Sequence, residues 1–119
     1  MTKLLPLLLV FGIGMALAAE SDTGRRPGDL VEYRIACLNE HVMLHVASRY
    51  MDARFMPEFY TGDCFRLPGP MSAKLIRFVE GPFTPVDAYG GLVSGDTGSV
   101  WAIRDLRGKI VYAWVIDRR

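Results

Sequence analysis

The sequence lacks the motifs that tie a chain to one kind of chemistry. Its serines do not stand in the G-x-S-x-G elbow of a hydrolase nucleophile. The glycine-rich residues 94–99 have neither the Gly-Lys-Ser/Thr of a P-loop nor the alternating carboxylates of an EF-hand. Nothing in the order of residues brings Glu80, Asp105 and Asp117 together in a pocket. We therefore expect no catalytic activity and no cofactor, and a small hydrolase remains a third alternative.

The chain also has almost no net charge. Of its 14 basic residues only Lys3 falls within the first 18 positions, and all 13 acidic residues follow them, so residues 19–119 carry 13 charges of each sign. A neutral domain offers no broad electrostatic footprint for nucleic acid or for an anionic membrane. We expect a partner of another kind.

The N-terminus has the pattern of an export signal. Lys3 precedes an apolar run over residues 4–18, the run ends in the small-x-small sequence of residues 16–18, and the chain then turns polar. An uncleaved anchor is the alternative, but the run is shorter than the roughly 20 residues that a spanning helix needs. The sequence predicts a signal peptide over 1–18, cleavage after Ala18, and a periplasmic or secreted protein without stable membrane insertion.

The remainder is long enough for one domain. Residues 19–28 are polar and predict a flexible leader, and residues 29–119 predict a single α+β domain. Cys37 and Cys64 are an even pair in an exported chain, which favours a disulfide. A redox pair would need the missing CxxC spacing, and a zinc site would need histidines near these cysteines.

The clearest periodic signal is a helix. Asn39 is a good N-cap, residues 39–54 lack glycine and proline, and Pro57 ends the pattern. Apolar side chains from Val42 to Ala53 fall on one arc, so we expect one main amphipathic helix packed on a small, mostly antiparallel sheet. Strands are expected over 29–37, 63–67, 73–80, 99–106 and 109–117, with a turn at residues 68–70.

The last two strands predict a hairpin closing at Arg107 and Gly108. A turn of two or four residues would place Trp101 opposite Trp114, and Ile103 opposite Tyr112. One face of the hairpin would then be aromatic. The other face would carry only small residues and would receive the helix; these are Val100, Ala102, Val111, Ala113 and Val115.

Two kinds of binding site follow from these patterns. Exposed tryptophan and tyrosine favour interfaces, so we expect a non-enzymatic protein-binding or accessory module with Trp101, Tyr112 and Trp114 as its contact. The alternative for these aromatic side chains is an ordinary core. A soft-metal or zinc binder is the second hypothesis, because His41 and His45 stand four residues apart on the helix. Both histidines lie on its polar arc, which makes them weak candidates, and no metal is expected.

Overall fold

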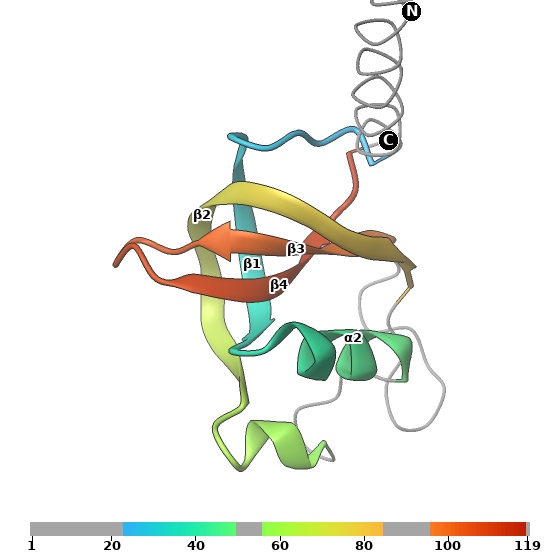
Figure 1. Cartoon of the computed structure of the whole chain (residues 1–119), viewed down its shortest axis with the longest axis vertical. Coiled ribbons are helices and arrows are strands. Elements are labelled where there is room, and N and C mark those ends of the chain that lie inside the picture. The colour runs from blue at the N-terminus through green and yellow to red at the C-terminus, as the bar shows by residue number, and fades with distance from the viewer. Residues whose placement is uncertain (1–22, 50–55, 85–95, 119) are drawn as a thin grey trace, which may run out of the picture.

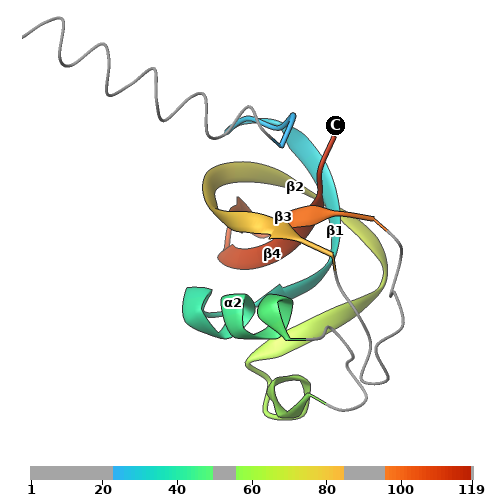
Figure 2. The same cartoon turned by 90° about the vertical axis from the view of Figure 1, so that its right-hand side faces the viewer.

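The computed structural model describes residues 23–49, 56–84 and 96–118. Its elements run β1 (Leu30–Cys37), α2 (Glu40–Ser48), η1 (Pro57–Phe59), β2 (Cys64–Phe83), β3 (Gly98–Arg104) and β4 (Ile110–Ile116). The four strands pair antiparallel in the order β1-β2-β3-β4 and close into a barrel. In both views α2 lies beneath β4 (Figures 1 and 2). A helix and an antiparallel sheet fit the expected α+β class.

The expected signal peptide lies outside the described residues, as does the start of the leader. Within the described ranges, no helix has the length and apolar character needed to cross a membrane. Cleavage after Ala18 stays a prediction.

Strand β2 is a single strand of 20 residues, whereas the sequence predicted two strands and a turn. Its first half pairs with β1 and its second half with β3. In the ladder with β1, the pair Tyr33↔Met71 is followed by Ile35↔Arg66. This step covers five positions on β2 but only two on β1, so β2 has three extra residues that form a bulge. Proline cannot donate to a ladder, and a bulge gives residues 68–70 a place without breaking the strand. The predicted turn at residues 68–70 is therefore wrong, because these residues form a bulge within β2.

The expected disulfide joins Cys37 to Cys64. The two residues are direct neighbours across the β1–β2 ladder, with a Cα–Cα distance of 3.9 Å, and both are buried. The bond closes the loop that contains α2 and η1. In the chain-entropy picture, such a loop contributes roughly 3 to 4 kcal/mol to stability.

Helix α2 begins where the sequence predicted. The Asn39 side-chain oxygen accepts hydrogen bonds from the backbone N–H groups of His41 (2.8 Å) and Val42 (3.4 Å). The helix ends at Ser48, shorter than the predicted 39–54. Residues 50–55 lie outside the described part of the chain. Met43, Val46 and Ala47 are its buried residues.

Two apolar clusters form the core. The first draws on all four strands and fills the barrel; its members include Val31, Leu75, Trp101, Ile103 and Val111. The second lies between the barrel and the helical segments, where Met43 and Val46 meet Ile35 and Val100. Tyr112 and Trp114 pack against this second cluster.

The β3–β4 register differs by one residue from the prediction. Arg104 pairs with Ile110, so opposed positions sum to 214, where a turn of two or four residues would give 215. Gly108 has a φ of +82°, and its N–H donates to the Asp105 carbonyl at 3.0 Å. The hairpin loop therefore has three residues, 106–108, with a left-handed glycine at its end. The odd number of loop residues accounts for the shift of one position in the register.

A shift of one residue reverses the face of every side chain on the shifted strand. Trp101 is paired with Ala113, and Trp114 is paired with Val100. The prediction that the two tryptophans oppose each other is wrong. The helix packs on the side of Val100, as predicted for β3, but this side carries Tyr112 and Trp114 from β4 where small residues were expected.

Candidate functional site

The three aromatic residues expected at the interface do not share a surface. Trp101 is 0% exposed, and its ring meets Phe78 edge-on with 5.4 Å between centroids. Tyr112 and Trp114 are half-buried on the opposite face of the hairpin, the face that packs against α2. For Trp101 the core alternative holds, since it belongs to the barrel interior.

Tyr112 takes part in a polar link between the helix and the barrel. The Arg77 guanidinium on β2 donates to Glu40 at the start of α2, with 2.6 Å between Nη2 and Oε1. The pKa of Arg77 is raised, first by this hydrogen bond and to a smaller degree by Tyr112 on β4. These contacts orient α2. They also place Tyr112 next to Arg77, so its hydroxyl takes part in the packing of the helix on the barrel.

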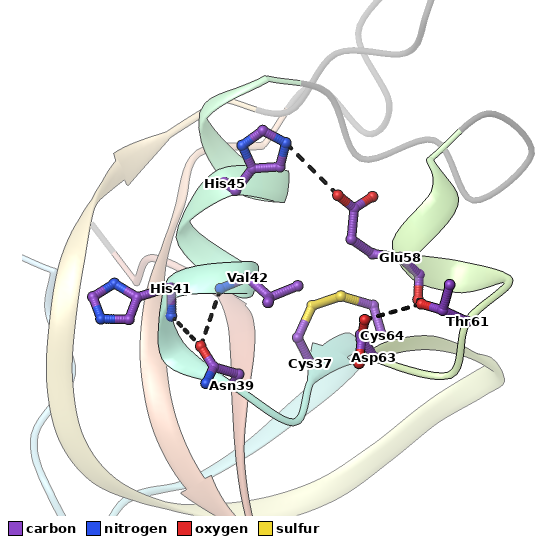
Figure 3. The surroundings of a disulfide bond; sticks show 9 residues. All are labelled: Cys37, Asn39, His41, Val42, His45, Glu58, Thr61, Asp63 and Cys64. Atoms are coloured by element: carbon purple, nitrogen blue, oxygen red, sulfur yellow. Dashed lines mark hydrogen bonds and ion pairs between the residues drawn. A yellow bond between two sulfur atoms is a disulfide. The ribbon is translucent and has the colours of Figure 1, made fainter.

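The two histidines do not converge on a common point. Figure 3 shows the His41 ring pointing away from His45, which turns toward η1. There the His45 Nε2 atom lies 3.7 Å from Oε1 of Glu58. Within residues 23–49, 56–84 and 96–118, no cluster of three or more histidine, cysteine, aspartate or glutamate side chains is placed to hold a metal ion.

A concave site opens at the end of the barrel where the β3–β4 hairpin turns. This barrel mouth has a volume of about 310 Å³. Tyr33 and Val111 come to it from the buried interior cluster, and Phe65 and Leu67 are partly buried against the same cluster. The floor of the mouth is therefore the core of the barrel. Figure 1 shows the hairpin tip projecting past the curve of β2.

The rim of the barrel mouth is also apolar, but it is open to solvent. Leu38 is 45% exposed, Met71 is 42% exposed and Leu106 is 72% exposed, and all three line the site. Leu38 follows β1 directly, Met71 follows the bulge of β2, and Leu106 occupies the hairpin turn. Large apolar side chains gathered around a concavity are typical of a contact site.

Polar groups stand on one side of the barrel mouth, around the Tyr33 hydroxyl. Burial raises the pKa of Tyr33, the Asp105 carboxylate raises it further, and Arg107 partly offsets both. The phenol, the carboxylate and the guanidinium all line the site and form its polar corner. Lys109 lines the same site.

Asp105 is committed to the turn that holds this corner. Its Oδ1 accepts hydrogen bonds from the backbone N–H groups of Arg107 and Lys109, each at 2.9 Å. The same carboxylate therefore fixes the turn and places the two cationic side chains that follow it.

A second opening lies between β1 and β4. These strands pair only through Ala36↔Ala113 and Cys37↔Tyr112 in the described chain. Farther along β4, the Arg25 guanidinium donates to the Ile116 carbonyl through Nε (3.2 Å) and Nη2 (3.1 Å). The side chain of Arg25 thus occupies the edge that a longer β1–β4 ladder would have covered.

The barrel mouth was not predicted from the sequence. Its residues come from three segments, 33–38, 65–72 and 105–111, and only the β2 bulge and the hairpin turn bring them together. The one available signal was Leu106, a leucine within an otherwise polar turn. Comparison of the chain with protein-family models, with curated proteins and with solved structures gave no match.

Proposed function

We propose that this protein is a non-catalytic binding module that acts on another protein, and that the barrel mouth is its contact site. The observation that carries the proposal is the combination of a floor made by the barrel core with exposed Leu38, Met71 and Leu106 around it. The site lies within the size range of ligand pockets, which runs from roughly 300 to 1,000 Å³. It replaces the aromatic hairpin face as the proposed surface.

The composition of the barrel mouth supports contact with a protein. Methionine, arginine and aromatic side chains are enriched at interface cores, and Met71, Arg107, Phe65 and Tyr33 all line the site. A partner side chain entering the mouth would be surrounded by apolar walls and excluded from water, as interface anchors are. Leu106 would fold over such an anchor from the turn.

The disulfide bears on the compartment in which the protein acts. A disulfide between neighbouring strands favours an oxidising environment. Together with the expected signal over residues 1–18, it supports a role in the periplasm or outside the cell.

In-cell photocrosslinking tests the proposal. A photoreactive phenylalanine analogue is placed at Leu106 in the full-length chain. The matched control carries it at Leu30, which is 70% exposed and does not line the barrel mouth. We expect a discrete crosslinked protein from position 106 and none of the same mass from position 30. Equal crosslinking at both positions, or none at 106, would contradict the proposed site.

A further inference from the structure

Four cationic side chains gather around the hairpin tip that borders the barrel mouth. They are Lys74 on β2, Arg104 at the end of β3, and Arg107 and Lys109 in the turn. Within residues 23–49, 56–84 and 96–118, no ion pair joins any of the four to a carboxylate. The domain is therefore nearly neutral as a whole but cationic at this end.

The arrangement of these cations is unfavourable for the isolated domain. Lys74 and Arg104 are direct partners in the β2–β3 ladder, and like charges in that position destabilise a sheet. Arg104 does not relieve the repulsion with an acid; its Nη1 donates to the Gly108 carbonyl at 3.0 Å. An arrangement that costs stability within the chain becomes favourable when an anion is bound beside it.

Asp105 opposes this cluster with one negative charge, so the five side chains together carry a net charge of +3. Its Oδ1 already accepts two backbone N–H groups of the turn. Arg107 and Lys109 therefore keep charge available at the edge of the barrel mouth, next to the exposed Leu106.

From this juxtaposition we propose that the barrel mouth binds an acidic peptide segment of its partner, with a bulky apolar side chain in the pocket and the flanking carboxylates beside Arg107 and Lys109. The inference rests on the proposed function and names the chemistry of the partner. An anionic bilayer also attracts cations and leucines, but it presents no protruding group to a concave site. The depth of the mouth down to Tyr33 and Val111 favours a peptide.

Fluorescence anisotropy with defined peptides tests the inference. The probe is a fluorescein-labelled heptapeptide with a central leucine flanked by glutamates. Two counterparts carry glutamine for every glutamate, or serine for the leucine. We expect the glutamate–leucine peptide to bind the purified protein most tightly, and its binding to weaken as salt is added because exposed charges are screened. Loss of either the charges or the leucine should weaken binding.

The protein variants separate the charge from the pocket. Arg107→Gln with Lys109→Gln should weaken the glutamate–leucine peptide about fivefold and leave the glutamine peptide unchanged. The matched control, Arg26→Gln with Arg118→Gln, removes two exposed cations elsewhere and should leave both affinities unchanged. Thermal melts of all variants should coincide, since none of the four side chains is buried.

Different outcomes overturn different claims. If the glutamate and glutamine peptides bind equally and the Arg107/Lys109 variant has no effect, the acidic partner is wrong while the barrel mouth remains the proposed site. If no peptide binds, or if Leu106→Ser leaves binding unchanged, the site itself is wrong. Binding of phosphatidylglycerol vesicles that needs Arg107 and Lys109, without binding of the peptide, would assign the surface to a membrane and overturn the inference.

Discussion

Removing the Trp101 side chain should cost the domain much of its stability. The indole is 0% exposed, fills the barrel interior, and meets Phe78 edge-on at 5.4 Å. Truncation of such a ring to alanine costs roughly 3 to 5 kcal/mol. However, the Trp101 Nε1 atom is buried and has no hydrogen-bond partner. Its removal relieves a desolvation penalty of about 1 to 3 kcal/mol, so we expect Trp101→Ala to fall at the lower end, about 3 kcal/mol.

Trp101→Phe isolates the two contributions. Phenylalanine retains most of the apolar ring and removes the unpaired N–H, so the lost packing and the relieved desolvation oppose each other. We expect a change within about 1 kcal/mol. The free energy of unfolding of both variants is measured by urea titration, with circular dichroism as the signal. The fluorescence of Trp114, which both variants retain, gives a second signal. A loss below about 1 kcal/mol for Trp101→Ala would refute the burial of this residue. Equal losses for alanine and phenylalanine would refute the argument from the unpaired N–H.

Two further predictions concern the hairpin turn and the barrel mouth. Gly108→Ala should lower the free energy of unfolding by about 1 kcal/mol, because φ at this position is +82° while no atom lies within 4 Å of an added Cβ; an unchanged urea midpoint would contradict the left-handed turn. The raised pKa of Tyr33 means that the folded state holds the phenolic proton more tightly than the unfolded state. Its contribution to stability is therefore complete below the ordinary tyrosine pKa of 10.0 and is lost as the pH rises through the folded-state pKa. Tyr33→Phe should reduce the alkaline loss of stability seen by urea unfolding, and an identical loss in both proteins would show that Tyr33 contributes nothing to it.

Local signals predicted the parts of the fold that depend on neighbouring residues. The strand expected over 29–37 is β1, and the Asn39 side chain caps α2 as expected. The pairing of Cys37 with Cys64 followed from the even number of cysteines in a chain that was expected to be exported. Each of these inferences needs only composition or a short window of sequence.

The errors arose where one residue decides a long-range arrangement. A single left-handed glycine, Gly108, shifts the β3–β4 register by one position and moves Trp101 to the face opposite Trp114. Residues 68–70 have turn composition, but in the structure they form a bulge within β2. The barrel mouth depends on both features, and no window of sequence contains them together.

Chemical-shift mapping tests the assignment of the barrel mouth as the binding site most directly. Amide spectra of the ¹⁵N-labelled protein are recorded as the glutamate–leucine peptide is added. We expect shifts at residues 33–38, 65–72 and 105–111, with little change along Glu40–Ser48 of α2. Shifts centred on α2, or spread evenly over the barrel, would contradict the assignment.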